Sequence, residues 1–285
     1  MFRDLKDFSN QATLKYDICI VGSGVAGLSV AKQLLKTNRK IVILESGGME
    51  IESRYQELNE GKNSGPKFLD LSSSRLRTFG GAGQLWAGHC APFERDDFEK
   101  KSYLSNSGWP ISMDDLEDYY KEASTMLRIS HKKFYNDDLI GNTLKEKSFK
   151  EINQNSSFLR TKAIQYAGKY RDFSRVYKKD FMESENTDII FHSTVTNLNV
   201  INDGNAVNSV SVSDLDDHKA TIEAKIIVLA AGALENPRIL LASNNYYKEG
   251  IGNSHKLVGT CFMSHPGIEK IGQIYRTALN ECYFH

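Results

Sequence analysis

Three glycines near the N-terminus have the spacing of a phosphate-binding loop. The segment VGSGVAGLS places Gly22, Gly24 and Gly27 in the pattern GxGxxG. Such glycines permit a tight turn, a close approach of the backbone to a pyrophosphate, and close packing of a helix on a strand. The N–H groups and partial positive charge at the start of that helix attract phosphates. The predicted cofactor-binding residues of this loop are Gly22, Ser23, Gly24, Ala26 and Gly27.

An acidic residue follows at the distance expected for a ribose ligand. Glu45 ends the segment KIVILE, about 20 residues beyond the glycines. A carboxylate there accepts hydrogen bonds from ribose hydroxyls and repels a 2′-phosphate, which disfavours NADP. We therefore predict that Glu45 and the adjacent Ser46 contact a dinucleotide. The alternative for the glycine pattern alone is a turn that binds no ligand.

Two further stretches are rich in backbone and poor in side chains. The segment TFGGAGQLWAGHC, from Thr78 to Cys90, crowds glycines and alanines into a second loop. Ala230, Ala231 and Gly232 follow the apolar run IIVL and present almost no side chain. Small residues there allow the backbone to pass against a bulky ligand. The alternative is tight packing of a helix on a sheet.

The elements that position these residues begin with a βαβ unit over residues 16–45. DICIV predicts a strand that ends at Gly22, and Leu28, Ala31 and Leu35 share one face of the helix that follows. The almost entirely apolar segment KIVILE predicts a parallel strand that is covered on both faces.

Later segments predict another helix and a series of strands. Ser112, with Asp115 in the first turn, is a plausible N-cap for a helix whose apolar stripe is Leu116, Tyr120, Ala123 and Leu127. From residue 188 the pattern changes to strands, with a hairpin turn at residues 202–205. KATIEAK and IIVLAAG predict two more strands, and ENPRILLAS predicts a helix with Pro237 in its first turn. Residues 131–157 are polar and weakly periodic.

Composition excludes several classes of partner. Lysine and arginine number 36 and balance 36 aspartates and glutamates, so no overall field attracts nucleic acid or an anionic membrane. The four cysteines are far apart and show neither zinc-ligand spacing nor a disulfide framework. No signal peptide or membrane-spanning run is visible. We predict no metal site, no nucleic-acid or membrane partner, and a cytoplasmic location.

The order of elements favours FAD over a nicotinamide cofactor. A nicotinamide dehydrogenase normally continues with further βα repeats, whereas this chain enters a long loop region and then a strand meander. We therefore predict an α/β fold: a Rossmann-type FAD-binding domain with an inserted β-meander. An NAD-dependent dehydrogenase is the less favoured alternative.

Separated motifs resemble the glucose–methanol–choline (GMC) oxidoreductases, in the branch of sugar and gluconate dehydrogenases. The resemblance covers most of the chain except the polar stretch and matches the N-terminal half of the family. Its motifs are YDICIVGSGVAGLS with ILESG, RLRTFGGAGQLWAGHCAPFERDDFE, SGWPISMDDLEDYY, the hairpin region, IIVLAAGALENPRILLAS and NSHKLVGTCFMSHPGI.

The resemblance implies how the second glycine-rich loop contributes to cofactor binding. In the family this loop lies along the FAD, beside the isoalloxazine and pyrophosphate. For Trp86, ordinary core packing is an equal alternative to packing near the flavin. Leu85 stands where some relatives carry a flavin-linked histidine, so FAD is expected to bind non-covalently. The residues implied are Gly80, Gly81, Gly83, Gln84, Trp86, Ala87, Gly88, Val195, Ala230, Ala231 and Gly232.

The resemblance also implies a reaction and a missing part. Complete family members oxidise the CH–OH group of an alcohol, polyol or sugar, with hydride passing to the flavin. Their catalytic histidine lies in a C-terminal segment that this chain does not match, so no catalytic residue is predicted. We expect residues 1–265 to form the FAD-binding domain and 266–285 to begin a truncated substrate domain. A catalytically silent FAD-binding remnant, or a split enzyme completed by a second polypeptide, is the alternative.

Overall fold

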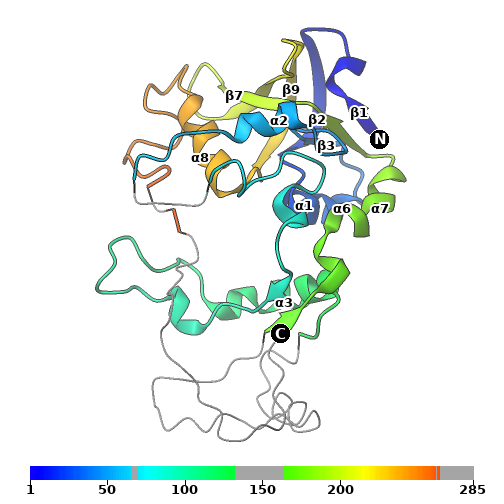
Figure 1. The fold of residues 1–285 in the computed structure, drawn as a ribbon. Coiled ribbons are helices and arrows are strands. Elements are labelled where there is room, and N and C mark those ends of the chain that lie inside the picture. The colour runs from blue at the N-terminus through cyan, green and yellow to red at the C-terminus, as the bar shows by residue number, and fades with distance from the viewer. Residues whose placement is uncertain (66–69, 132–163, 261, 264–285) are drawn as a thin grey trace, which may run out of the picture. The chain divides into compact units, whose positions relative to one another are not determined.

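A seven-stranded sheet organises the first of two units of the chain (Figure 1). The computed structural model describes residues 1–65, 70–131, 164–260 and 262–263. One compact unit contains Met1–Trp86 and Asp172–Ser264, and Ala87–Arg171 belong to the other. The predicted polar stretch lies almost wholly outside the described residues, and so does the predicted start of a substrate domain at 266–285. The proposed domain division therefore stays a prediction.

The sheet combines a parallel core with an antiparallel meander. The strand order is β1-β6-β3-β2-β9-β8-β7, and every neighbouring pair from β1 to β9 is parallel. β7, β8 and β9 pair antiparallel, as the predicted hairpin and meander require. The predicted Rossmann-type α/β fold is confirmed. The strands are β1 Phe2–Asp4, β2 Ala12–Val21, β3 Ile41–Leu44, β6 Thr187–Phe191, β7 Thr194–Val200, β8 Val207–Ser213 and β9 Lys219–Leu229.

Short helices and the longer α1 lie between these strands in the chain, and the longer α8 follows the last strand. α1 contacts β2 and β3, and α8 contacts β7. The helical elements of this unit are η1 Leu5–Asp7, α1 Val25–Leu34, α2 Ser53–Gln56, η2 Glu57–Asn59, η3 Gly81–Gln84, α6 Phe173–Val176, α7 Lys178–Met182 and α8 Gly232–Ala242. The predicted βαβ unit is therefore β2, α1 and β3.

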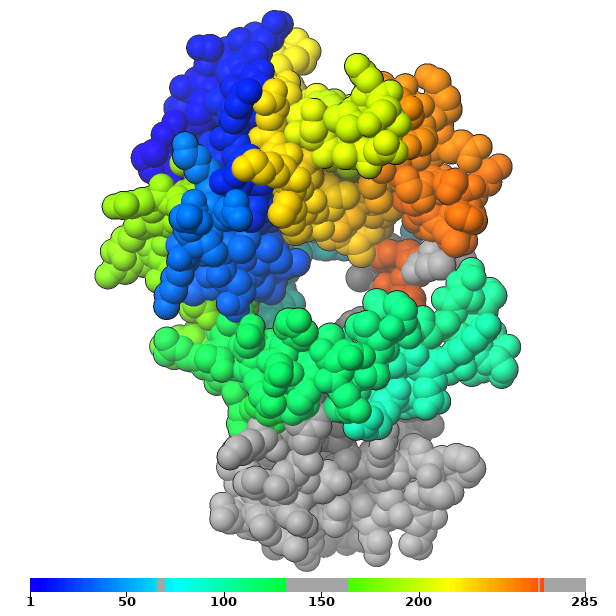
Figure 2. Space-filling model, turned by 180° about the vertical axis from the view of Figure 1, so that it is seen from behind, coloured from blue at the N-terminus to red at the C-terminus, as the bar shows by residue number. Residues whose placement is uncertain are grey.

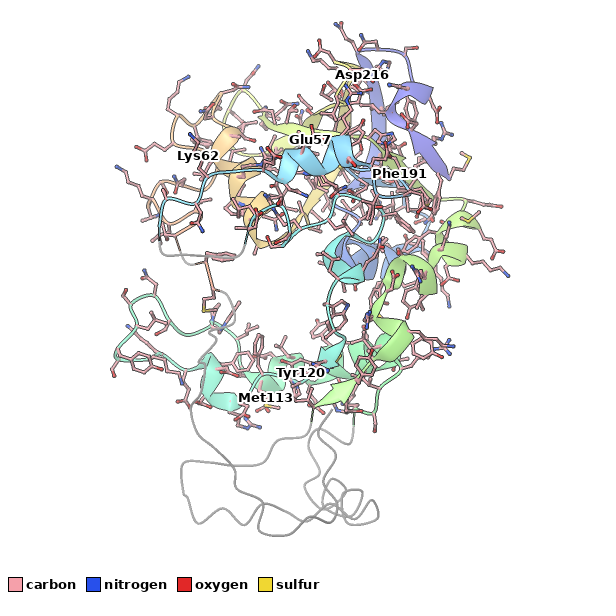
Figure 3. All side chains as sticks on the ribbon, viewed as in Figure 1. Glu57, Lys62, Met113, Tyr120, Phe191 and Asp216 are labelled. Atoms are coloured by element: carbon pink, nitrogen blue, oxygen red, sulfur yellow. The ribbon has the colours of Figure 1, made fainter. Side chains whose placement is uncertain are left out.

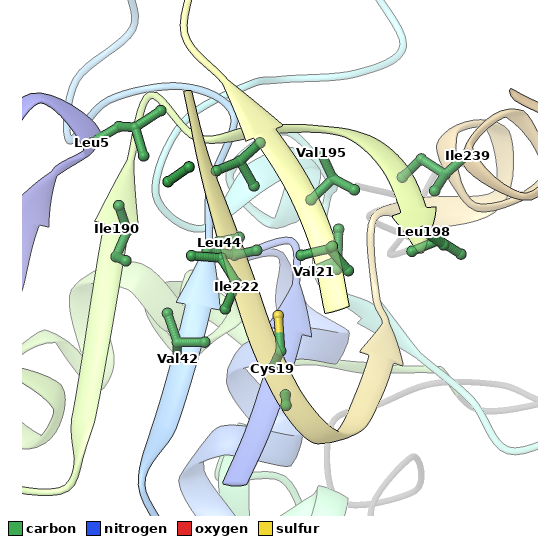
Figure 4. Close-up of a cluster of buried hydrophobic side chains, with 14 residues drawn as sticks. Leu5, Cys19, Val21, Val42, Leu44, Ile190, Val195, Leu198, Ile222 and Ile239 are labelled. Carbon is green, nitrogen blue, oxygen red and sulfur yellow. The ribbon is translucent and has the colours of Figure 1, made fainter. Parts of the chain in front are cut away.

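The parallel strands are buried on both faces, which explains their continuous apolar sequence. Alternate residues of a strand point to opposite faces. Val21 and Leu44 join Val195 and Ile222 of the meander in one apolar cluster (Figure 4). Ile20 alternates with these residues and is also fully buried. Burial on both faces is typical of parallel sheets, as predicted.

The N-terminus adds an edge strand that the sequence did not predict. β1 pairs with β6, and its FRD sequence is too short to show a period. In Figure 2 the blue N-terminal residues lie against yellow residues of β9, where Ala12 pairs with Ala220. Lys6 Nζ lies 2.6 Å from the carboxylate of Asp216, which Figure 3 shows on the turn between β8 and β9. These contacts fix the N-terminal segment to the sheet.

Two local predictions for the first unit were wrong. KATIEAK and IIVLAAG were expected to form separate strands, but residues 219–229 form the single strand β9. No glycine, proline or asparagine interrupts this segment, and it pairs with β8 and β2 at once. α8 begins at Gly232, so Pro237 lies inside the helix and not in its first turn. The helix therefore lacks one backbone donor at that position.

The second unit contains the predicted helix after Ser112. Its elements are β4 His89–Cys90, η4 Arg95–Phe98, α3 Met113–Leu127, β5 Gln165–Tyr166 and η5 Gly168–Arg171. Ser112 and Asp115 form the expected capping box, because each side chain accepts a hydrogen bond from the other residue's N–H. Met113 and Tyr120 project from this helix in Figure 3. Ala123 was placed wrongly in the apolar stripe, since it is exposed and Ser124 is buried instead.

Candidate functional site

A cavity of about 640 Å³ lies at the carboxyl ends of β2, β3 and β9. Its lining begins with Val21, Leu44 and Leu229, the last residues of these three parallel strands. Ligands of open α/β sheets bind in the crevice outside the carboxyl ends of the strands. The volume falls within the roughly 300–1,000 Å³ of small-molecule sites. All of the lining residues belong to the first unit.

The glycines of the first loop are of two kinds, those with no room for a side chain and one that faces open space. Gly22 has φ +102°, and a Cβ atom there would lie 2.7 Å from the carbonyl oxygen of Ala230. A Cβ at Gly27 would lie 2.0 Å from the oxygen of Gly22, so close packing of α1 on the strand excludes any side chain. Gly24 has no atom within 4 Å of the position of its Cβ. Its backbone therefore faces open space at the start of α1.

The second glycine-rich loop lies directly beside the first. Gly80 forms an isolated parallel bridge with Gly24, and its N–H donates to the carbonyl oxygen of Ser23 at 3.1 Å. A Cβ at Gly81 would lie 3.2 Å from the Cα of Gly24, which leaves no room for larger residues between the loops. The two glycine clusters, distant in sequence, thus meet at one edge of the cavity.

Most of the predicted cofactor residues line this cavity. Five glycines that we call the glycine wall form part of the lining: Gly22, Gly24, Gly81, Gly83 and Gly232. The other predicted residues in the lining are Ala26, Glu45, Ser46, Val195, Ala230 and Ala231. Because these residues come from five separate segments, only the fold brings them to one place.

Seven predicted residues lie outside the lining. Ser23, Gly27, Gly80 and Gln84 pack behind the glycine wall, where the side chain of Gln84 donates to the carbonyl oxygen of Phe79. Trp86 is half-buried at the end of the first unit. Ala87 and Gly88 belong to the second unit, in which the oxygen of Gly88 accepts a bond from Ala167 N–H. Direct contact of these seven residues with a cofactor stays a prediction.

Glu45 has protein partners that the sequence did not indicate. Its carboxylate accepts from Ser23 N–H at 3.1 Å, from the Ser23 hydroxyl at 2.5 Å and from Gly47 N–H at 3.0 Å. Burial raises the pKa of Glu45, and the hydrogen bonds from Ser23 and Gly47 oppose this effect. The carboxylate therefore joins the end of β3 to the glycine loop, whatever it contributes to a ribose.

A cluster of charged residues forms another part of the lining, and sequence reasoning missed it. We call Arg75, Arg77, Glu235 and Arg238 the arginine wall. The Glu235 carboxylate is paired with Arg75, with Arg77 Nη2 at 3.3 Å and with Arg238 Nε at 2.6 Å. The RLR tripeptide at residues 75–77 was the only sequence feature that pointed to this cluster, but nothing in the sequence connects it with Glu235.

Arg77 is the most connected member of this wall. Its guanidinium donates to Asn59 Oδ1 at 2.9 Å and to Ser46 Oγ at 2.9 Å, and its backbone N–H and oxygen both bond to the Gln56 amide. Burial lowers the pKa of Arg77, while Glu235 opposes that shift. Burial alone raises the pKa of Glu235, but the arginines outweigh it and lower the pKa overall. The wall is therefore charged at neutral pH.

Other kinds of site are not found in the part of the chain that the structure describes. No group of three or more histidine, cysteine, aspartate or glutamate side chains there could hold a metal ion. None of the helices among these residues is long and apolar enough to cross a bilayer. Cys19 is buried in β2, and Cys90 is partly exposed.

Comparison with known proteins gives this geometry a family context. Residues 74–267 match the family model of the GMC oxidoreductases. The chain is 22% identical to the fructose dehydrogenase large subunit of Gluconobacter japonicus over 90% of the chain and 59% of that protein. It is 24% identical to a glucose dehydrogenase [FAD, quinone] of Drosophila melanogaster over 83% of the chain and 44% of that protein. The chain thus spans about half the length of these relatives.

Solved structures agree on the fold. A formate oxidase aligns with a TM-score of 0.51 at 15% sequence identity, over 83% of this chain and 48% of that one. At this identity the similarity supports the architecture of the sheet and its helices and carries nothing about substrate.

Proposed function

This chain belongs to the GMC oxidoreductase family, and we propose that its cavity binds FAD non-covalently for the oxidation of a CH–OH group. The observation that carries the proposal is the meeting of two glycine clusters at the start of α1, through the bridge between Gly24 and Gly80. Together they line a cavity of about 640 Å³ at the carboxyl ends of the parallel strands.

The residues of the cavity fit a dinucleotide. The positions that Cβ atoms would take at Gly24 and Gly232 are free of other atoms within 4 Å, so each glycine presents bare backbone to the cavity. Gly24 is also the N-cap of α1 and no side chain caps that helix start. The first N–H groups of a helix have no intrahelical partner and favour negative charge. A pyrophosphate supplies that charge.

Each part of the lining has a separate task in this proposal. The start of α1 and the second glycine loop hold the pyrophosphate, and Glu45 and Ser46 face the ribose of the adenosine. Val195, Ala230 and Ala231 provide an apolar surface for the rest of the cofactor. When bound, FAD supplies the hydride acceptor, and the protein supplies orientation and exclusion of water. Non-covalent binding is expected because Leu85, in the place of a histidine, has no nucleophilic atom.

The substrate is proposed to be a sugar, sugar acid or other polyol. Two relatives are named for oxidation of fructose and glucose, and one of these is named as a large subunit. The chain spans about half of each, so the groups that activate the substrate are proposed to lie outside the matched part. A second polypeptide is one source of those groups. No catalytic base is assigned to a described residue.

The visible spectrum of the purified protein tests cofactor binding. A yellow preparation, or yellow colour after FAD is added and unbound FAD removed, is expected. Acid precipitation should then release the flavin into the supernatant, whereas a covalent link would leave it with the protein. A colourless protein that refuses FAD but binds NADH would contradict the proposal and support a nicotinamide enzyme.

Dye reduction tests the enzymatic part of the proposal. Flavin-loaded protein is assayed with fructose, glucose and gluconate, alone and after addition of the proteins encoded beside it. Reduction of the dye with one of these donors supports the oxidoreductase function. Flavin binding without reduction under any of these conditions favours a catalytically silent module.

A further inference from the structure

Three arginines surround a single carboxylate at one side of the cavity. Arg75 and Arg77 are almost buried, with 19% and 11% of their side chains exposed, and Glu235 is 9% exposed. Arg238 is more open, at 47%, and lines the same cavity. Because charges held away from water need compensation, three guanidinium groups around one carboxylate favour the binding of a further negative group.

The charge balance of the cavity leaves the arginines in excess. Three arginines and two glutamates line it, and the second glutamate, Glu45, is bonded to Ser23 and Gly47 rather than to an arginine. Around Glu235 itself, three guanidinium groups and one carboxylate leave a net charge of +2. No other acidic side chain belongs to the lining within the described residues.

The start of α8 adds to this positive character. The helix has 11 residues, begins at Gly232 and has no side-chain cap at Ala231. Gly232 has open space at the position of its Cβ and lines the cavity, as do the next residues of the first turn. The partial positive charge of a helix N-terminus therefore points toward the same volume as the arginines.

Arg238 is the arginine of this wall whose guanidinium N–H groups are not all used. The guanidinium groups of Arg75 and Arg77 bond to Glu235 and also to carbonyl, hydroxyl or amide oxygens of their own surroundings. Arg238 uses Nε for Glu235, and its two Nη groups donate to no other described residue. Glu235 is three residues earlier on α8, so it fixes the direction of the Arg238 guanidinium.

We propose that the arginine wall is a phosphate-recognition surface, and that Arg238 donates directly to a phosphate group of the ligand. Glu235 acts as a positioning residue for Arg238, and Arg75 and Arg77 supply the buried field. The inference rests on the proposed function only for the identity of the ligand as FAD. Recognition of a diphosphate group by Arg238 does not depend on it.

The test measures four ligands on the flavin-free chain by titration calorimetry. FAD, ADP and inorganic pyrophosphate carry phosphate groups, whereas riboflavin carries none. The variant Arg238→Gln removes the charge and the Nη donors. Arg175→Gln is the matched control, because Arg175 Nε also pairs with a carboxylate three residues earlier, at 3.0 Å from Asp172, but lies outside the cavity lining.

Loss of a hydrogen bond to a charged group predicts about ten- to hundredfold weaker binding of FAD, ADP and pyrophosphate to Arg238→Gln. Riboflavin should bind equally to that variant and to the wild type. Arg175→Gln should bind all four ligands normally, and Arg238→Lys should retain part of the phosphate affinity because it keeps the charge.

The outcomes separate this inference from the proposed function. Unchanged FAD binding by Arg238→Gln overturns the inference while FAD binding by the protein stands. An equal loss for riboflavin and FAD also overturns it, because the effect is then one of cavity shape. If the wild type refuses FAD but binds ADP in a manner that depends on Arg238, phosphate recognition stands and the proposed function fails. If Arg238→Gln does not fold, Arg238→Ala is measured at low temperature instead. Full retention of its phosphate affinity overturns the inference, and loss of that affinity supports it.

Discussion

The glycine wall and the arginine wall line one cavity by opposite means. The glycine wall presents backbone without side chains, and the bridge between its member Gly24 and the neighbouring Gly80 joins the two glycine loops. The arginine wall presents long charged side chains that are held by one carboxylate, that of Glu235. Local sequence patterns mark the glycines of the first wall before the fold brings them together, whereas no local pattern connects the arginines of the second wall with Glu235. The first wall therefore offers bare backbone to a ligand, and the second offers charge.

Removal of the central carboxylate should have the largest effect. Glu235→Ala leaves the guanidiniums of Arg75 and Arg77 almost buried without their counter-ion. Breaking a buried pair from one side typically destabilises a protein by about 3–5 kcal/mol. Urea unfolding measures the change. Glu223→Ala is the control, since Glu223 is 44% exposed and its surface pair with Lys15 should contribute less than about 1 kcal/mol. Equal effects of the two variants would show that the arginine wall contributes nothing to stability.

Two substitutions within the glycine wall and its support should separate packing from ligand contact. At Gly27 a Cβ would lie 2.0 Å from the oxygen of Gly22, so Gly27→Ala should destabilise the protein by up to about 3 kcal/mol. At Gly24 nothing lies within 4 Å of the Cβ position, so Gly24→Ala should change stability by less than about 1 kcal/mol. Its FAD affinity should nevertheless fall at least about tenfold, because the methyl group occupies the space of a phosphate. Normal FAD binding by Gly24→Ala would contradict the assigned role of this wall.

The backbone that carries the arginine wall has a clamp of its own. The Gln56 amide accepts from Arg77 N–H at 3.0 Å and donates to Arg77 oxygen at 2.7 Å. Gln56→Ala leaves both groups without these partners and should lower the free energy of unfolding by about 1–2 kcal/mol. Thermal and urea unfolding measure it. Lys15→Ala, at a side chain that is 77% exposed, should stay within about 0.5 kcal/mol. A Gln56 variant as stable as this control would show that the clamp is dispensable.

The smallest expected effect lies outside both walls, at His192. Its Nδ1 and Nε2 bond to the carboxylates of Asp4 and Glu52, the second at 2.8 Å, and its ring stacks on Tyr55. Burial lowers the pKa of His192, but the bonds to Glu52 and Asp4 outweigh burial and raise the pKa overall.

A raised pKa of a histidine gives a definite sign to the pH dependence. The folded state binds the proton more tightly, so the stabilisation is complete below the unfolded pKa of about 6.5 and is lost as pH rises through the folded pKa. His192→Asn tolerates the φ of +53° at this position and removes the titrating group. Unfolding of wild type and variant between pH 5 and pH 9 measures the difference, in steps of about one unit. Identical pH profiles would show that the bonds of His192 to Asp4 and Glu52 do not stabilise the folded state.

The elements that could be predicted are those with strong local signals. The GxGxxG spacing, the apolar segment KIVILE and the turn at residues 202–205 correctly predicted β2, α1, β3 and the hairpin of β7 and β8. Ser112 and Asp115 correctly predicted the start of α3. Each of these patterns is complete within a few residues, so neighbours in sequence are enough to determine the local conformation.

Predictions that depended on a distant partner were less accurate. β9 is one strand because β2 and β8 both pair with it, although its sequence resembles two short segments. β1 forms because β6 offers it an edge. Pro237 lies inside α8 because the helix starts at Gly232, earlier than predicted. For both strands a pairing partner far away in the chain decided the outcome.

The candidate site shows the same division. By itself the sequence determined the backbone-rich loops, since glycine acts through the lack of a side chain at its own position. Only the tertiary structure decided that Ser23 and Gly47 hold Glu45, and that Arg75, Arg77 and Arg238 gather around Glu235. Electrostatic partners are set by distance in space and by burial. The parallel sheet fixes both when it brings the ends of β2, β3 and β9 to one edge.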